Sequence, residues 1–219
     1  MAEPIKLSPS ALNGFLACPR CFWLDRHGYE QPSMHMPLYN VMDGLEKKYY
    51  DKHRKEGLPP LLKGKIPYKL ADEALVMKLR QYLGWTDEKL GAKLWGKIDD
   101  CFVAKDGTLV VLDNKTRAGE FKELYDSFKF QLETYAFLLS KNGFKVNLKT
   151  GYIVYFVPNK ESDFDKGIKF EIDVHPVKLD VDRVPKTFKK AVEVVKQSKA
   201  PAHHKECEVG LWLKAIGEL

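Results

Sequence analysis

The chain has 219 residues, of which 44% are apolar and 30% charged, and its formal net charge is +6. A chain of this size can bury a hydrophobic core without disulfide or metal crosslinks, and no stretch approaches the roughly 20 apolar residues that cross a bilayer. The modest lysine excess suits a polyanionic partner but lacks the dense basic runs of a nucleic-acid-binding tail. Because the first ten residues contain no apolar signal core, we expect a cytoplasmic protein without membrane association.

The N-terminal part of the chain is expected to be helical. Ser8 followed by Pro9 is typical of a helix start, with a hydroxyl N-cap and proline at the first helical position. This helix should be interrupted at Pro19 and then restart. Apolar and aromatic residues recur at helical spacing over 38–49 and predict a second helix, which should end near Gly57.

Residues 58–94 combine the signals of loop, edge strand and short helix. From Trp95, two strand-like segments flank the short loop at 105–107 and predict an antiparallel hairpin. The elements expected from there are strands over 95–104 and 108–116, a helix over 124–141, strands over 148–157 and 168–174, and a helix over 182–199 with a tail.

The hairpin places carboxylates and a lysine among apolar residues. Asp113 and Lys115 are two positions apart, so both side chains lie on one face of their strand. A three-residue loop with Gly107 in the left-handed position places Asp99 opposite Asp113, whereas a two-residue loop places Asp100 there. The sequence suits the three-residue loop better, so we favour Asp99 and keep Asp100 as the alternative.

Two carboxylates at one cross-strand spacing repel each other unless a cation lies between them. Hard oxygen ligands suit Mg²⁺ or Mn²⁺, and we therefore expect Asp99 and Asp113 to bind such a metal. Lys115 could then orient or deprotonate a water molecule and stabilise negative charge on a phosphate. Taken alone, an Asp-x-Lys sequence is more often a solvated ion pair at a strand end.

A third candidate element lies on the helix after the hairpin. Gln131 precedes Tyr135 by one turn, so the two side chains are neighbours at the border of an apolar helix face. Gln131 could reach a phosphate or an active-site water, and a surface amide of an ordinary amphipathic helix is the alternative.

Together these residues resemble a known family, the RecB-type nucleases of the PD-(D/E)xK superfamily. That group includes the CRISPR adaptation nucleases and the nuclease domains of bacterial recombination helicases. The segment LSPSALNGFLACPRCFWL is similar to the group's opening, and the matches extend over most of residues 7–140. Each motif is short, and their order and spacing carry the resemblance. The matching positions are Gly96, Asp99, Asp113, Lys115, Thr116, Gln131 and Tyr135.

The resemblance implies an α/β (α+β) fold of the restriction-endonuclease type, with a central mixed sheet flanked by helices and a helical N-terminal lobe. It implies a Mg²⁺- or Mn²⁺-dependent DNase, either an exonuclease or a nuclease of single-stranded or branched ends. Its role would lie in DNA repair, recombination or CRISPR adaptation, alone or within such a complex. The alternative is a DNA-binding or adaptor protein of the same fold. The expected single domain covers 1–219, with a helical part at 1–57, catalytic sheet and helix at 95–175, and C-terminal helix and tail at 180–219.

The sequence departs from the family in the second helix. Many relatives carry a metal-binding histidine four residues after a glycine there, and the corresponding residue after Gly44 is Lys48. Glu46 could supply a carboxylate from the same helix, as in superfamily members that use glutamate. His53 is a weaker substitute. We therefore predict Glu46 as the third metal ligand.

The cysteines also depart from the family. Relatives with an iron–sulfur cluster use one N-terminal cysteine and three near the C-terminus, and Gly210 stands where one of those cysteines would be. The residues present suggest either such a cluster or, with histidine included, a zinc site. The alternative is buried helix cysteines beside solvated histidines. The candidate ligands are Cys18, Cys21, Cys207 and His203, with His204 as an alternative to His203.

A phosphodiester substrate needs cationic contacts around the scissile bond. Arg117, just past the Asp-x-Lys-Thr segment, has the best position for contacting a phosphate. Arg20 and Lys122 are the further candidates for nucleic-acid binding.

Overall fold

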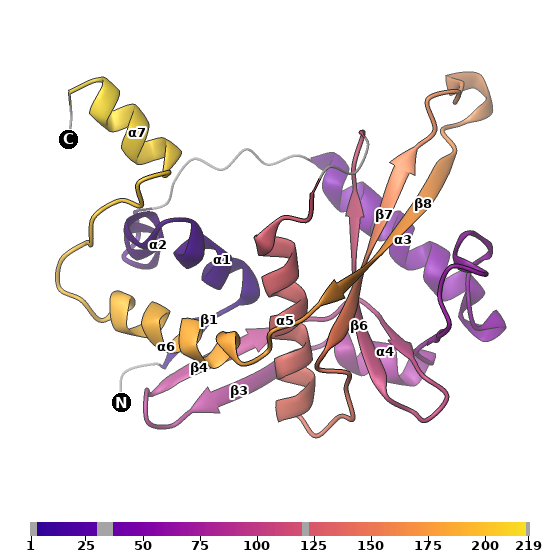
Figure 1. Cartoon of the computed structure of the whole chain (residues 1–219), viewed down its shortest axis with the longest axis horizontal. Coiled ribbons are helices and arrows are strands. Elements are labelled where there is room, and N and C mark those ends of the chain that lie inside the picture. The colour runs from indigo at the N-terminus through magenta and orange to yellow at the C-terminus, as the bar shows by residue number, and fades with distance from the viewer. Residues whose placement is uncertain (1–3, 30–36, 120–122, 218–219) are drawn as a thin grey trace. The chain divides into compact units, whose positions relative to one another are not determined.

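The computed structural model describes residues 4–29, 37–119 and 123–217. They form two compact units, which contain different elements (Figure 1). None of the helices within the described ranges is both long and apolar enough to cross a membrane. The expectation of one nuclease domain over the whole chain stays a prediction. Unit 1 comprises Met1–Met34, Gly84–Trp95 and Asp182–Leu219, and unit 2 comprises His35–Leu83 and Gly96–Val181.

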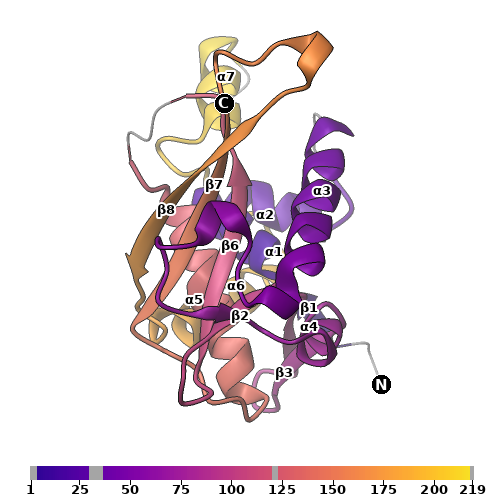
Figure 2. The same ribbon diagram turned by 90° about the vertical axis from the view of Figure 1, so that its right-hand side faces the viewer.

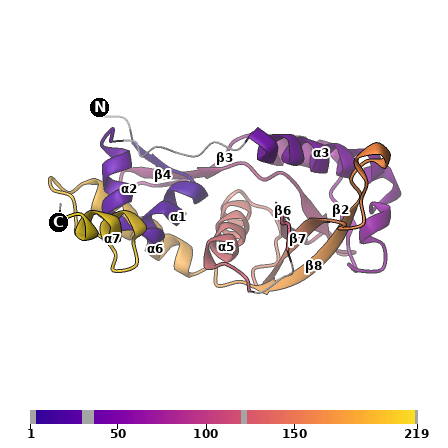
Figure 3. The ribbon, with the colours of Figure 1, turned by 90° about the horizontal axis from the view of Figure 1, so that it is seen from above.

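Unit 2 is built on a mixed five-stranded sheet in the order β2-β5-β6-β7-β8. The central pair, β6 and β7, is parallel, and the other neighbours are antiparallel. Figure 2 and Figure 3 show helices α3 and α5 on opposite faces of this sheet. The elements are α3 (Pro37–His53), β2 (Lys69–Leu70), α4 (Glu73–Leu79), β5 (Cys101–Val103), β6 (Leu109–Thr116), α5 (Asp126–Lys141), β7 (Thr150–Pro158) and β8 (Phe170–Lys178), with 3₁₀ turns at Arg54–Glu56, Pro60–Leu62 and Phe164–Lys166.

Alternation along β6 divides the core of unit 2 into two clusters. Val111 packs with Leu132 of α5 on one face of the sheet. Val110 and Leu112 pack with Tyr50 of α3 on the other face. Successive strand side chains point to opposite faces. At the polar end of β6, Lys115 therefore points toward α5, whereas Asn114 and Thr116 point toward α3.

The hairpin turn has the predicted three-residue loop. The Ala104 amide donates to the Thr108 carbonyl oxygen over 2.9 Å, and the Gly107 amide donates to the Ala104 carbonyl oxygen over 3.0 Å. Gly107 has a φ of 80°, in the left-handed region where a side chain is disfavoured. The register that follows from this loop is therefore confirmed.

The strand expected over 95–104 is interrupted, and that part of the prediction was wrong. Strand β4 (Ala92–Gly96) ends at Gly96, and β5 begins only at Cys101. Between them the Ile98 amide donates to the carbonyl oxygen of Leu79, 2.9 Å away, instead of to a neighbouring strand. The Ile98 side chain is fully buried, which explains why the segment reads as a continuous apolar strand.

Unit 1 contains a three-stranded sheet in the order β1-β4-β3 together with the terminal helices. The predicted helix start is confirmed, because Ser8 Oγ accepts a hydrogen bond from the Ala11 amide over 3.2 Å. The predicted interruption also occurs, at Cys18 before Pro19. Residues 208–215, expected as tail, form a helix. The elements are β1 (Ile5–Leu7), α1 (Pro9–Ala17), α2 (Pro19–Arg26), β3 (Leu83–Asp87), β4, α6 (Arg183–Val195) and α7 (Glu208–Ala215).

Candidate active site

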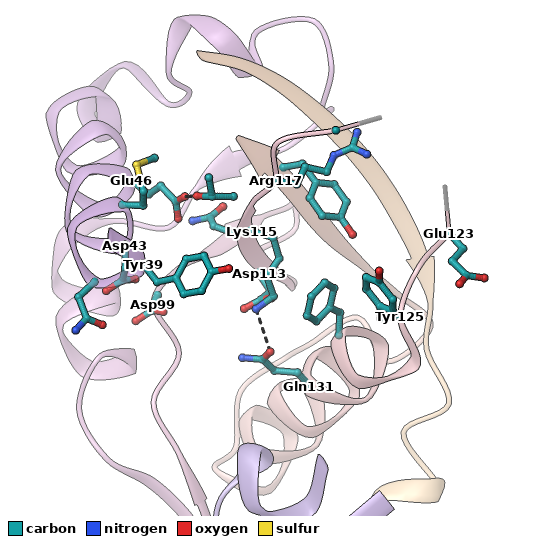
Figure 4. Close-up of a pocket in the computed structure, with 17 residues that line it drawn as sticks. Tyr39, Asp43, Glu46, Asp99, Asp113, Lys115, Arg117, Glu123, Tyr125 and Gln131 are labelled. Atoms are coloured by element: carbon teal, nitrogen blue, oxygen red, sulfur yellow. Dashed lines mark hydrogen bonds and ion pairs between the residues drawn. The ribbon is translucent and has the colours of Figure 1, made fainter. Parts of the chain in front are cut away.

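A cavity of about 720 Å³ lies in unit 2 beside the polar end of β6. Its walls come from α3, β6, α5, the loop before β5 and the segment leading into α5 (Figure 4). Six of the predicted catalytic, metal-binding and DNA-binding residues lie together here, although they come from positions 46 to 131 of the chain. Those that line the cavity are Glu46, Asp99, Asp113, Lys115, Arg117 and Gln131.

Asp113 and Asp99 supply the two carboxylates of the predicted hairpin site. Cys101 pairs with Val111 in the register that the loop sets, and Asp99, in the segment just before β5, lines the cavity together with Asp113. Asp113 is 8% exposed, and burial raises its pKa. The neighbouring charge of Asp99 adds to this rise, whereas Lys115 opposes it. The two carboxylates therefore form a negative centre that favours a cation.

Asp100, the alternative to Asp99, lies elsewhere. Its side chain is 2% exposed, and its two oxygens accept hydrogen bonds from Arg54 over 3.1 and 2.6 Å. Arg54 is itself buried and donates further hydrogen bonds to Asp51 and to the Ala71 carbonyl oxygen. Asp100 thus belongs to a structural ion pair that fixes the start of β5.

Lys115 is held by two partners on the α5 side of the sheet. Its Nζ lies 2.6 Å from Asp113 Oδ2 and donates to Gln131 Oε1 over 3.2 Å. The Gln131 amide nitrogen in turn donates to the Tyr135 hydroxyl oxygen over 2.6 Å. Tyr135 is 7% exposed and is not among the residues that line the cavity. Tyr135 therefore orients Gln131, which orients the lysine.

The helical carboxylate predicted near Gly44 is present in the cavity. Glu46 is buried on α3 and accepts a hydrogen bond from Thr116 Oγ1 over 3.0 Å. Burial raises its pKa to about 7, and the neighbouring acidic groups contribute to this rise. The weaker candidate, His53, lies 3.3 Å from Glu56 and does not line the cavity.

Two site residues were missed at the sequence level, Asp43 and Lys47. Lys47 Nζ lies 2.8 Å from Asp99 Oδ1 and 2.8 Å from Asp43 Oδ2. Burial alone would lower the pKa of Lys47, but these ion pairs raise it. The Lys47 ammonium therefore lies where the carboxylates of Asp99 and Asp43 attract a cation. The i,i+3 spacing of Asp43 and Glu46 on one helix was the signal that could have revealed this second acidic group.

The comparison of the sequence with protein families gives one decisive match. The family model described as PD-(D/E)XK nuclease superfamily matches residues 39–209. The chain belongs to the PD-(D/E)XK nuclease superfamily. No curated protein matches it. Among solved structures, one described as "Crystal structure of SSO0001" is similar at 18% identity and a TM-score of 0.49, over 100% of this chain and 89% of that one.

Membership in the PD-(D/E)XK superfamily confirms the predicted fold class, a mixed sheet flanked by helices. Superfamily members are nucleases that generally use divalent metals such as Mg²⁺. The matched range contains every residue that lines the cavity. The cavity of this PD-(D/E)XK protein is therefore its candidate active site.

Aromatic rings and a guanidinium group border the same cavity. Tyr39 and Tyr125 line it with exposed side chains (Figure 4). Arg117 lies 4.6 Å from the centre of the Tyr155 ring, and its Nη2 is 2.6 Å from Asp173 Oδ2. Such rings can stack on bases, and such a cation can meet a phosphate.

Of the two other predicted DNA contacts, Arg20 does not line this cavity. Arg20 belongs to unit 1, where its Nη1 donates to the Pro201 carbonyl oxygen over 3.1 Å. Lys122 lies outside the described residues.

The predicted cysteine and histidine ligands come together within unit 1. Their ligand atoms all lie within 4.8 Å of one another. The choice that the sequence left open is resolved toward His203, whereas the His204 ring is not part of the group. Burial raises the pKa of Cys18, but hydrogen bonds, including those from the backbone amides of Cys21 and His204, lower it to about 6.

Replacing Lys47 with methionine is expected to lower the Mg²⁺ concentration needed for half-maximal binding about fivefold. The ammonium competes with a metal for Asp99 and Asp43, and an ion pair at this exposure is worth about 1 kcal/mol. A Mn²⁺ or Mg²⁺ titration by calorimetry measures the change. Lys48→Met is the matched control, because Lys48 is the next residue of the same helix and its side chain is exposed. An unchanged metal affinity in Lys47→Met would show that Lys47 does not compete.

Proposed function

We propose that this PD-(D/E)XK protein is a Mg²⁺- or Mn²⁺-dependent deoxyribonuclease that hydrolyses phosphodiester bonds. The observation that carries the proposal is the convergence of Asp99, Asp113 and Lys115 on one cavity, with Lys115 held by Gln131. Two carboxylates and an ordered ammonium are the groups that metal-assisted phosphodiester hydrolysis requires.

The donor set fits a hard divalent cation. Asp99, Asp113 and Glu46 offer only carboxylate oxygens to the cavity, and oxygen-only sites suit Mg²⁺ and Mn²⁺ better than Zn²⁺. The raised pKa values of Glu46 and Asp113 reflect like charges and burial that a cation would relieve. We therefore assign these three residues as metal ligands, with Asp43 as an outer acidic neighbour.

A metal held there would polarise a phosphate oxygen and acidify a bound water. Lys115 contributes a positive charge beside the reacting phosphate and a donor that orients the attacking water. Gln131 fixes the lysine and can itself contact that water, and Tyr135 acts as a positioning residue behind it. Arg117, at the edge of the cavity, supplies a contact to a neighbouring phosphate.

The substrate favoured by the cavity walls is DNA with unpaired bases. Exposed aromatic side chains such as Tyr39 and Tyr125 can stack on bases only where these are not paired within a duplex. This supports action on single-stranded or branched ends, and exonuclease action of the RecB type is the other form that the proposal includes. A cytoplasmic role in DNA repair, recombination or CRISPR adaptation, within a complex or alone, and DNA contacts by Arg20 and Lys122 belong to this same proposal.

The test is cleavage of labelled DNA by the full chain. Single-stranded, duplex and branched substrates, labelled at the 5′ or the 3′ end, are incubated with Mg²⁺, Mn²⁺ or EDTA. We expect cleavage with either metal, none with EDTA, and a preference for substrates with single-stranded ends. The double variant Asp99→Asn/Asp113→Asn, purified in parallel, controls for a contaminating nuclease.

The same experiment distinguishes a nuclease from a DNA-binding adaptor of the same fold. An adaptor of this fold would bind the labelled DNA but leave it intact under every metal condition. Cleavage that the double variant retains in full would contradict the proposed site. Binding without cleavage by the wild type would replace the nuclease proposal with the adaptor function.

A further inference from the structure

Four potential ligand atoms meet in unit 1, whereas the elements that form the cavity belong to unit 2. Cys207 Sγ lies 3.5 Å from Cys21 Sγ and 3.4 Å from His203 Nδ1. His203 Nδ1 also lies 3.6 Å from Cys18 Sγ and 3.8 Å from Cys21 Sγ. The other ring nitrogen, Nε2, is buried without a hydrogen-bond partner. His203 Nδ1 therefore faces the sulfur atoms of all three cysteines.

Four of the six separations among these atoms match the edges of one small tetrahedron, and all six are within 4.8 Å. Zinc bonds of about 2.3 Å to sulfur and about 2.0 Å to nitrogen put tetrahedral ligands roughly 3.5–3.8 Å apart. The four separations given above, 3.4 to 3.8 Å, fall in or next to this range. Three thiolates and one imidazole are also a known ligand set of structural zinc sites.

An iron–sulfur cluster does not fit the same group. Each cysteine of a four-iron cluster binds a different iron, so the body of the cluster separates the ligand sulfurs. Ligand atoms that all lie within 4.8 Å of one another leave no room for it. The cluster that the family resemblance suggested is therefore disfavoured by the size of the site.

Gly210 explains how a histidine entered this group. A Cβ atom at position 210 would lie 2.8 Å from both Cβ and Cγ of His203, closer than side-chain carbons approach. The chain thus lacks a side chain at 210, and the imidazole of His203 occupies the space.

We propose that Cys18, Cys21, His203 and Cys207 bind one Zn²⁺ ion as a structural site. The inference does not depend on the proposed nuclease activity, because the ligands and the cavity residues belong to different units.

The role of the ion follows from where its ligands lie in the chain. Cys18 is the N-cap residue of α2, and Cys21 lies within that helix. Cys207 is the N-cap residue of α7 and follows Cys21 by 186 positions. Within α7 only Gly210 is buried, so this helix has little apolar burial to hold it in place. Zinc would fix the first turn of α7 to α2, and removal of the metal should release α7.

The experiment is metal analysis of the full chain, purified without oxygen from cells supplied with both iron and zinc. Elemental analysis, acid-labile sulfide and the visible spectrum are measured on the same sample. We expect about one zinc per chain, no sulfide and no visible absorption. Iron with sulfide and a visible charge-transfer band would overturn the proposal, as would folded protein containing less than a tenth of an equivalent of zinc.

Variants then assign the ligands. His203→Ala and Cys207→Ser should lose at least nine-tenths of the zinc, and Gly210→Ala should weaken zinc retention because its Cβ displaces His203. His204→Ala is the matched control and should keep the full equivalent. Full retention by His203→Ala, or loss by His204→Ala alone, would overturn the assignment.

A measurement on the wild type avoids variants that fail to fold. Cobalt substitution should give the intense d–d bands of tetrahedral sulfur–nitrogen ligation. Chelation of the zinc should accelerate hydrogen exchange of the α7 amides at least tenfold. Octahedral cobalt bands, or α7 exchange that is independent of zinc, would contradict a structural zinc site.

Discussion

Lys115→Ala is expected to slow DNA cleavage about 100- to 1000-fold, the usual cost of one preorganised charge-stabilising donor. DNA binding should change by less than about threefold, because Arg117 and the aromatic rings at the cavity remain. Lys115 also opposes the rise in the pKa of buried Asp113. Its loss should therefore raise that pKa further, and metal binding by the variant should weaken first at acidic pH.

Single-turnover cleavage at pH 8 and at saturating Mn²⁺ isolates the chemical step from this change in metal binding. Lys145→Ala is the matched control, because Lys145 is an exposed lysine paired with Asp106 at the hairpin turn. The control should cleave at the wild-type rate. Cleavage by Lys115→Ala within threefold of wild type would remove Lys115 from the reaction.

Substitutions of the neighbouring residues Asp99 and Asp100 should have opposite effects on stability and on cleavage rate. Asp100→Ala is expected to destabilise the protein by about 3–5 kcal/mol, because it leaves the buried Arg54 charge without its main partner. Asp99 is 46% exposed and pairs with Lys47 at the rim of the cavity, so Asp99→Ala should change stability by less than about 1 kcal/mol. Its cleavage rate, in contrast, should fall at least 100-fold.

Denaturant unfolding and single-turnover cleavage on the same two variants measure this contrast. Asp100→Ala is assayed at a temperature where it remains folded, and its rate per folded molecule should match that of the wild type. If Asp100→Ala lost activity while Asp99→Ala kept it, the metal ligand would be the other carboxylate.

The hairpin site was predictable because its geometry is local. The loop with Gly107 fixed the register of β5 and β6, and this register favoured Asp99, which lines the cavity, over Asp100, which does not. The two-residue spacing of Asp113 and Lys115, and the one-turn spacing of Gln131 and Tyr135, are likewise set by strand and helix geometry alone. Neither of these two spacings depends on tertiary contacts.

Features that depend on distant contacts were not predictable in the same way. Arg54 pairs with Asp100 from 46 positions away, and nothing local marks either residue as buried. The interruption of the strand at Ile98 depends on a hydrogen bond to Leu79. Helix α7 was missed because a short helix with one buried residue has almost no apolar periodicity to detect.

The choice between His203 and His204 was open for the same reason. Both residues offer an imidazole at almost the same point of the sequence, and only the fold shows which ring meets the sulfurs. The sequence draws attention to Gly210 through the family resemblance. Only the fold shows that His203 occupies the space that a side chain at position 210 would need.

Metal-dependent hydrolysis at the carboxylates of the β6 hairpin can be tested by comparing two variants. Asp113→Asn and Asp106→Asn make the same chemical change on the same hairpin, the first in the cavity and the second at the exposed turn. Single-turnover cleavage of single-stranded DNA at saturating Mn²⁺ is measured for both. We predict the wild-type rate for Asp106→Asn and a rate about 1000-fold lower for Asp113→Asn. Equal rates for the two variants would contradict the account.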